Sequence, residues 1–354
     1  MPFVLKTFVL KKDFPTKLIG INFHGYSSAA YQNRPTAVPP RDYIEDSFKI
    51  FAKNGITCVR VAIYWESWEL DSTKCREDLD AIAHAADKYG IMCIYDNHQW
   101  ECSSWIGCGI GMPNSILSRY YENRTGEHLP DYYTKKDFWN KWWNHKIKTI
   151  DGADGWEAQI DYLKDIINLL KNRKSTFGFE VLNEPEIFNI LHYRKVGKYH
   201  NYMIIQLRKI TDKPLLFCWV LPHKVIDNPV LQTLARPTTK DNIIYDGHLY
   251  PPSVIRMIYF RLISLLMGNI PLYIGEFNSG YSLGATWTEK QFSIYIKRFK
   301  SFGTCGCALW RWSYIEDRNI PAFNLTRVVN GVIQPGLFFN YFLNALKNST
   351  TTMT

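Results

Sequence analysis

Eight short apolar runs recur along the chain, and longer amphipathic segments separate them. Several runs are apolar almost throughout instead of alternating with polar residues, which is typical of parallel strands covered on both faces. Strands that alternate with helices in this way predict an α/β fold built on a parallel sheet. The expected strands lie at residues 17–24, 56–64, 91–98, 176–184, 214–221, 242–250, 271–277 and 304–312.

The segments between these runs have the spacing of helices that bury one face. In residues 41–55, Ile44, Phe48 and Phe51 recur on one side of a helix, and Gly55 supplies a stop signal. Residues 77–90 repeat the plan and again close on a glycine. Further helical patterns occupy residues 161–173, 202–210 and 291–303.

Eight strands that alternate with helices favour a single (β/α)₈ TIM barrel over an open, doubly wound sheet. The open sheet would want a glycine-rich phosphate turn after its first strand, and GINFHGYSS is not such a turn. We find no linker, repeat or low-complexity tract, so residues 1–354 are expected to form one catalytic domain. A long insertion, 101–154, follows the third strand and should emerge on the catalytic face, where long loops usually carry function.

Composition excludes several classes of protein. Of 354 residues, 46% are hydrophobic and 21% are charged, so the chain is neither disordered nor fibrous. The net charge of +9 could suit a nucleic-acid partner, but the basic residues are scattered and no such partner is predicted. Aromatic residues reach 15%, which indicates a large core or a cleft in which flat rings stack on a ligand. Four tryptophans fall within the insertion: Trp105, Trp139, Trp142 and Trp143.

No segment has the roughly 18 consecutive apolar residues that a membrane span needs. The most apolar stretch, 254–267, contains Arg256 and Arg261 and is interpreted as a core-facing helix. Residues 1–14 are interrupted by Lys6 and lack a signal-peptide cleavage site. Cysteine spacing predicts no metal site, and a local disulfide between Cys102 and Cys108 stays open. Five others should be buried thiols: Cys58, Cys93, Cys218, Cys305 and Cys307.

Polar side chains lie near the ends of these strands, where a (β/α)₈ barrel builds its active site. Each alone could be solvated or ion-paired, but so many on successive strands are hard to attribute to packing, because burial without a partner is costly. The candidates are His24, Arg60, His98, Asn183, Glu184, His248, Tyr250, Glu276 and Trp310.

Two of these candidates are carboxylates on opposite sides of the expected barrel, Glu184 and Glu276. Glycoside hydrolysis requires such a pair, one to protonate the leaving oxygen and one, ionised, to attack or to activate water. Retaining enzymes hold the two groups about 5–5.5 Å apart. The segment VLNEPE (181–186) resembles the acid/base signature of glycoside hydrolase family 5, the cellulase family, and GEF (275–277) resembles its nucleophile strand.

The resemblance implies a role for each candidate. Glu184 would be the acid/base and Glu276 the nucleophile, with the pKa of Glu184 raised while its proton is needed. Asn183 would bind the sugar 2-hydroxyl. The remaining roles are orientation of the nucleophile for Arg60 and Tyr250, proximity to the acid/base for His248, sugar contacts for His24 and His98, and an aromatic platform for Trp310 or Trp312.

Four further carboxylates lie near these positions. Asp96 would support His98 or point into the barrel, and Glu186 is expected on the surface. Glu66 and Glu101 also follow strand ends and are weaker candidates for substrate contact.

The favoured interpretation is a retaining endo-β-1,4-glucanase without a cofactor, acting as a monomer on a polysaccharide or oligosaccharide. Because a polymer-degrading enzyme is usually exported, the protein is expected to be secreted, and the missing leader keeps the cytoplasm as the alternative. Alternatives within the family are a β-mannanase, an exo-β-glucosidase and a glycolipid-directed hydrolase, which would want an exposed apolar patch such as 257–267. A non-catalytic carbohydrate-binding barrel would be expected to lack one of the paired carboxylates.

Overall fold

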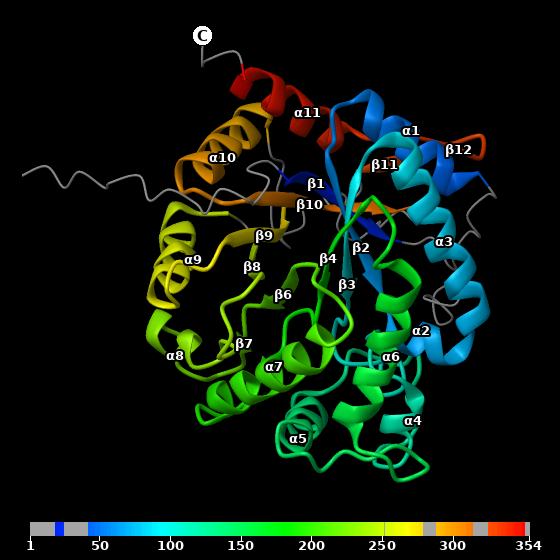
Figure 1. Cartoon of the computed structure of the whole chain (residues 1–354), viewed down its shortest axis with the longest axis vertical. Helices are drawn as coiled ribbons and strands as arrows, with labels where there is room; N and C mark the ends of the chain where they lie inside the picture. The colour runs from blue at the N-terminus through cyan, green and yellow to red at the C-terminus, as the bar shows by residue number, and fades with distance from the viewer. Residues whose placement is uncertain (1–17, 25–41, 251, 279–287, 314–324, 351–354) are drawn as a thin grey trace, which may run out of the picture.

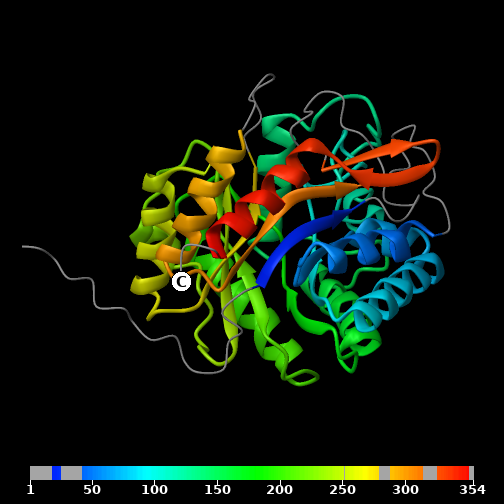
Figure 2. The same cartoon turned by 90° about the horizontal axis from the view of Figure 1, so that it is seen from above.

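A closed barrel of eight parallel strands forms the centre of the molecule (Figure 1). The computed structural model describes residues 18–24, 42–250, 252–278, 288–313 and 325–350. Around the barrel the strands follow the order β1-β10-β9-β8-β6-β4-β3-β2, so chain neighbours lie side by side. Figure 2 shows β1 and β10, the first and last barrel strands, pairing to close the ring. The (β/α)₈ prediction is confirmed.

Each of the eight expected runs matches one barrel strand, and only β10 extends past its run, by one residue. The bounds are β1 Leu18–His24, β2 Cys58–Ile63, β3 Met92–Asn97, β4 Thr176–Glu180, β6 Leu215–Cys218, β8 Ile243–Leu249, β9 Leu272–Phe277 and β10 Gly306–Ser313. The remaining strands form two small sheets, parallel β5 (Glu186–Ile187) with β7 (Leu221–Pro222) and antiparallel β11 (Thr326–Val329) with β12 (Val332–Pro335).

Helices surround the barrel and cover its strands. Their ends follow the expected chemistry: α3 ends at Gly90, which has a left-handed φ of 70°, and Asp71 caps the start of α3 with its side chain. The bounds are α1 Tyr43–Lys53, α2 Trp65–Leu70, α3 Ser72–Tyr89, α4 Asn114–Leu117, α5 Tyr132–Trp142, α6 Gly155–Leu170, α7 His192–Arg208, α8 Pro229–Thr233, α9 Val254–Leu266, α10 Glu289–Ser301 and α11 Leu337–Thr350. None of the helices in the described ranges is long and apolar enough to cross a membrane.

The insertion 101–154 is a packed subregion instead of an open loop. It contains α4 and α5, and the side chains of Trp139, Trp142 and Trp143 are fully buried. Trp139 and Trp143 stack at 5.2 Å, and Trp143 packs edge-on against Tyr199 of α7. These three rings therefore belong to the core, and the interpretation that tryptophans of the insertion line a cleft does not apply to them.

The two ends of the barrel differ in chemistry. A small apolar cluster fills its amino-terminal part, whereas the carboxyl-terminal part holds charged and polar side chains. All eight cysteines are free thiols, which settles the open alternative for Cys102 and Cys108. The cluster consists of Leu18, Cys58, Ile94, Phe177, Leu216, Ile244, Tyr273, Cys305 and Ala308.

Candidate active site

The two candidate carboxylates face each other above the carboxyl ends of the strands. Glu276 is the fifth residue of β9, and Glu184 follows β4 by four residues. One oxygen of each carboxylate and a nitrogen of His248 all lie within 4.8 Å of one another. Of the two separations found in glycosidases, the shorter, about 5–5.5 Å in retaining enzymes, is the one nearer to this spacing.

Glu276 is held by two donors. The guanidinium of Arg60 donates to Oε1 at 2.9 Å, and the hydroxyl of Tyr250 donates to Oε2 at 2.7 Å. Both contacts stabilise a negative charge on the carboxylate and fix its orientation. The structure thus brings Arg60 and Tyr250 together with Glu276, as the sequence analysis predicts.

Glu184 shares a hydrogen bond of 2.6 Å with Nδ1 of His248. Burial alone would raise the pKa of Glu184, but the charge and hydrogen bond of His248 lower it below its usual value. Burial alone would lower the pKa of His248, whereas Glu276 and Glu184 raise it well above its usual value. The pKa of Glu184 is thus shifted in the direction opposite to the predicted one, because the charge of the neighbouring imidazole favours the ionised carboxylate.

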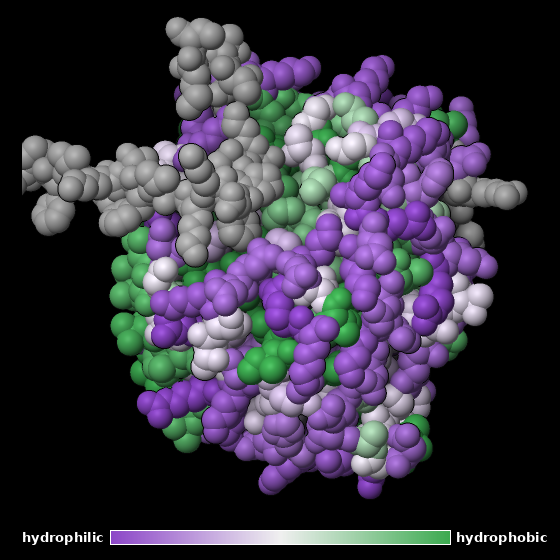
Figure 3. Space-filling model, viewed as in Figure 1, coloured by the Kyte–Doolittle hydropathy of each residue, from purple (hydrophilic) through white to green (hydrophobic). Residues whose placement is uncertain are grey.

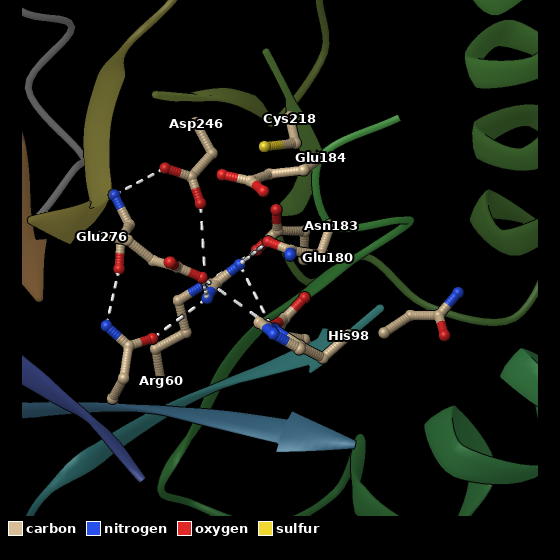
Figure 4. Close-up of polar contacts among 12 residues, drawn as sticks. Arg60, His98, Glu180, Asn183, Glu184, Cys218, Asp246 and Glu276 are labelled. Atoms are coloured by element: carbon tan, nitrogen blue, oxygen red, sulfur yellow. Dashed lines mark hydrogen bonds and ion pairs between the residues drawn. The ribbon is translucent and has the colours of Figure 1, made fainter. Parts of the chain in front are cut away.

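A buried charge network supports both carboxylates from below (Figure 4). The fully buried guanidinium of Arg60 pairs with Asp96 at 3.1 Å, Glu180 at 2.8 Å and Asp246 at 3.6 Å, in addition to Glu276. Burial raises the pKa of Glu180 well above its usual range, more than Arg60 lowers it. The sequence analysis did not select Glu180 or Asp246, although an acidic residue within an apolar strand is a signal that could have found them.

The backbone of Glu184 is strained and braced. Its φ of 40° lies in the left-handed region, which a residue with a side chain rarely adopts. The buried amide of Gln99 donates to the carbonyl oxygens of Asn183 at 3.1 Å and Glu184 at 2.9 Å. The carbonyl oxygen of that amide accepts from the backbone N–H of Cys102, in the insertion. Gln99, which the sequence analysis missed, therefore ties the acid/base turn to the insertion.

Asn183 is positioned by the same surroundings. Its Oδ1 accepts from Arg60 at 2.8 Å, and its Nδ2 donates to the backbone oxygen of Gln99 at 2.9 Å. An amide nitrogen carries two hydrogens, so one remains for a ligand. Asn183 can therefore donate to a sugar hydroxyl in this geometry.

Aromatic rings form one wall of the site. Trp310 stacks on His98 with ring centres 5.3 Å apart and lies 5.6 Å from the ring of His24. Tyr64, which the sequence analysis did not select, packs edge-on against both histidines at 5.5 Å. The carboxylate of Asp96 lies 2.6 Å from Nδ1 of His98, and this contact fixes the orientation of the imidazole. The alternative that Asp96 supports His98 is thus the one the structure favours.

Trp312 does not belong to this wall, and its assignment as a sugar platform is wrong. Its side chain is fully buried, donates to the hydroxyl of Ser47 at 2.9 Å and packs against Phe51 and Phe339. Two residues apart on a regular strand, Trp310 and Trp312 would share a face. The pairing of β1 with β10 shifts register between Leu309 and Trp312, so an extra residue on β10 reverses the alternation.

Glu186 is another correction, because it is buried instead of lying on the surface. Its carboxylate pairs with His223 at 2.5 Å and with Lys135 of α5 at 3.4 Å. Lys135 also contacts Glu101, so one lysine of the insertion joins the carboxylates of Glu186 and Glu101. Burial raises the pKa of Glu66 to about 7, and Glu66 accepts from the backbone of Ser104. These carboxylates brace the insertion.

Among the residues that the structure describes, two groups of side chains have spacings that could hold a metal ion. They are Glu180 with Cys218 and His248, and Glu184 with His248 and Glu276. Arg60 pairs with a carboxylate of each group. Its positive charge would oppose a cation at either position, and the arrangement thus favours proton chemistry.

A parallel (β/α)₈ barrel that carries two facing carboxylates at its carboxyl-terminal end is the architecture of a glycoside hydrolase. A family model, cellulase (glycosyl hydrolase family 5), matches residues 9–316, and the chain belongs to this family. No curated protein sequence matches the chain.

Solved structures with the same fold include three informative neighbours. An endogalactoceramidase is 18% identical with a TM-score of 0.68, over 93% of this chain and 80% of that one. Endo-glycoceramidase II from Rhodococcus sp., in complex with a cellobiose-like imidazole, is 17% identical with a TM-score of 0.64, over 93% and 78%. An endo-β-1,4-glucanase from Xanthomonas axonopodis pv. citri is 14% identical with a TM-score of 0.62, over 95% and 99%.

Proposed function

We propose that this protein is a retaining, endo-acting β-glycosidase with Glu276 as nucleophile and Glu184 as acid/base. The observation that carries the proposal is the contrast between the two carboxylates, which lie within 4.8 Å of each other. Two donors orient Glu276, whereas Glu184 shares its hydrogen bond with the imidazole of His248, whose pKa is raised by Glu276 and Glu184. One group is prepared to attack and the other to transfer a proton, as double displacement requires.

In the first step, Glu276 attacks the anomeric carbon and the bond to the leaving oxygen breaks. That oxygen takes a proton from Glu184, and the proton reaches Oε1 of Glu184 along the 2.6 Å hydrogen bond from His248. The carboxylate of Glu276 loses its charge as it becomes an ester. Arg60 keeps its pairs with Asp96 and Glu180, so it remains in place through the step.

In the second step, Glu184 removes a proton from water, and the resulting hydroxide attacks the anomeric carbon from the face that the leaving group vacated. The ester bond to Glu276 breaks and the sugar leaves with its configuration retained. Asn183 donates its remaining N–H to the 2-hydroxyl, a contact that strengthens in the transition state. Trp310 and His98 form an apolar wall on which a sugar ring can lie.

The substrate that we propose first is a β-1,4-linked glucan. The support is the correspondence of chain length with the Xanthomonas endo-β-1,4-glucanase, 99% of which is covered. A second candidate is a β-linked glycolipid. It is favoured by a row of exposed aliphatic side chains on α9 and by the similarity to endoglycoceramidases.

A substrate panel tests the proposal. Reducing-sugar release from carboxymethylcellulose, mixed-linkage β-glucan, mannan and xylan, and from glycosylceramide in mixed micelles, would identify the substrate. NMR of the first product should show a β-anomer, and an α-anomer would contradict retention. Glu184→Gln and Glu276→Gln should both lose activity, while Glu77→Gln, at an exposed carboxylate of α3, serves as the control. Activity that survives both substitutions would mean that the wrong carboxylates have been chosen.

A further inference from the structure

Helix α9 exposes a continuous row of aliphatic side chains. Ile255, Ile258, Leu262 and Leu266 are between 42% and 80% exposed. Their spacing of three and four residues places them on one face of the helix. The opposite face packs into the core through Met257, Phe260 and Ile263. A helix on the surface of a soluble barrel normally turns polar residues to water on its outer face, so this row, here called the α9 stripe, needs an explanation.

The apolar surface continues onto the neighbouring helix. Val230 of α8 is 65% exposed and Ile226, just before α8, is 67% exposed. Figure 3 shows hydrophobic residues gathered along the edge of the molecule where Figure 1 places α8 and α9. The stripe is therefore part of a contiguous apolar face, larger than isolated exposed side chains would make.

The charged side chains of α9 itself are positive, and a carboxylate outside the helix, Asp227, contacts it through the hydroxyl of Tyr259. Helix α9 contains no Asp or Glu, and Arg256 and Arg261 lie within it. Arg236 donates to the backbone oxygen of Met267 beside its last turn, and Lys240 lies beside Gly268. None of these four cations forms an ion pair with a carboxylate in the ranges that the structure describes.

The stripe begins near the catalytic end of the barrel. Tyr250, which donates to Glu276, precedes the first residue of α9 by only four positions. From Ile255 to Leu266 the helix rises roughly 16 Å, at about 1.5 Å per residue. A flat surface against the stripe would therefore lie along the side of the barrel and reach the edge of the active-site opening.

We propose that the α9 stripe docks on an anionic lipid bilayer, with its aliphatic side chains among the headgroups and its arginines and lysine against lipid phosphates. Aliphatic side chains bordered by unpaired cations are the composition of helices that lie in the membrane interface. A protein partner would be expected to find aromatic anchors and a mixed-charge rim on this face. Docking would bring the active site to a glycolipid in the bilayer, so its biological role rests on the glycolipid candidate of the proposed function. Binding to the bilayer can be measured without hydrolysis.

Vesicle sedimentation tests the docking. The full chain is mixed with vesicles of phosphatidylcholine alone or with 30 mol% phosphatidylglycerol, at low and high salt. We expect binding to the anionic vesicles that weakens as salt screens the charges. Ile255→Ser/Leu262→Ser should weaken this binding at least tenfold, and Arg256→Gln/Lys240→Gln should remove most of the preference for anionic lipid. Leu70→Ser, at a residue of α2 that is 49% exposed, is the matched control and should bind like the wild type.

Three outcomes would overturn the proposal. They are no binding of the wild type to either vesicle, equal binding by Ile255→Ser/Leu262→Ser, and a wild-type dimer in sedimentation velocity that this double variant abolishes. The last result would assign the stripe to a second copy of the chain.

Two controls separate docking from catalysis. The melting temperature shows that each variant is folded, and hydrolysis of a soluble aryl β-cellobioside should be the same in the double variant and the wild type. A wild-type protein that hydrolyses the aryl β-cellobioside but binds neither kind of vesicle would refute docking alone. Vesicle binding without hydrolysis of any glycoside would refute the proposed function and leave docking in place.

Discussion

Two regions concentrate conspicuous side chains, the insertion 101–154 with its tryptophans and the ring of charged residues at the carboxyl ends of the barrel strands, here called the strand-end ring. They use these side chains in opposite ways. The insertion buries Trp139, Trp142 and Trp143 against helices, away from water. The ring buries charges instead, and Arg60 and His248 balance its carboxylates. The comparison shows that a conspicuous residue type indicates a function only when its position on the barrel also does.

The two regions are nevertheless joined at the acid/base turn. The indole of Trp143 donates to the backbone oxygen of Glu186 at 2.8 Å, and Lys135 of α5 pairs with the carboxylate of the same residue. Gln99 bridges Cys102 and Glu184 from the other side. The insertion therefore acts on the site through the backbone that carries Glu184.

The largest effect is expected when a charge is removed from the strand-end ring. Glu276→Gln should lower kcat by roughly 10⁴-fold or more, because no other group can form the covalent intermediate. The melting temperature should change little, since the amide can keep one of the two hydrogen bonds to the carboxylate. Assays with an aryl β-glycoside measure both. A loss that only follows unfolding would mean that Glu276 is structural.

Substitution of one tryptophan in each region should distinguish a role in stability from a role in catalysis. Trp143→Ala should cost about 3–5 kcal/mol of stability, because it leaves a cavity in the buried cluster. Trp310→Ala should lower kcat/KM while the melting temperature falls much less, since Trp310 lines the site. Chemical denaturation and steady-state kinetics on both variants test the contrast. Equal stability losses would remove the distinction between core and wall.

The link between the regions is tested at Gln99. Gln99→Ala should lower kcat about 10–100-fold with KM nearly unchanged, because displacement of a catalytic group by about 1 Å costs on this order. Gln99→Glu loses both N–H donors and should behave similarly, although it conserves shape. A merely structural role would lower the melting temperature and leave kcat per folded molecule as in the wild type.

The last expected effect, which is small near pH 4.5 and grows as pH rises, concerns Glu180 beneath the active site. Burial raises its pKa above the ordinary value of 4.5, so the folded protein keeps this proton when the unfolded chain has lost it. The stabilisation is fully present below pH 4.5 and is lost as pH rises through the folded pKa. Stability of the wild type relative to Glu180→Gln should thus fall by about 1.4 kcal/mol per pH unit above 4.5. Denaturation of both proteins from pH 4 to 7 measures it, and a constant difference would show that Glu180 is ionised.

Much of the fold was predictable because its signals are local. Seven of the eight strands fall within the expected runs and β10 extends one residue beyond its run, since continuous apolar runs between glycine-ended helices leave little other than a parallel barrel. The positions of Glu184, Glu276, Arg60 and Tyr250 followed because parallel strands bring their carboxyl ends to one rim. The internal packing of the insertion did not follow, because its apolar residues lack a regular period.

Amino-acid order alone therefore determined the barrel, its insertion and the residues that meet at its rim. Tertiary structure decided three further points. A register shift on β10 sent Trp312 away from Trp310, contact with Lys135 and His223 buried Glu186, and the charge and hydrogen bond of His248 lowered the pKa of Glu184. Each depends on groups far apart in sequence, and the free energy of a buried charge depends on which groups surround it.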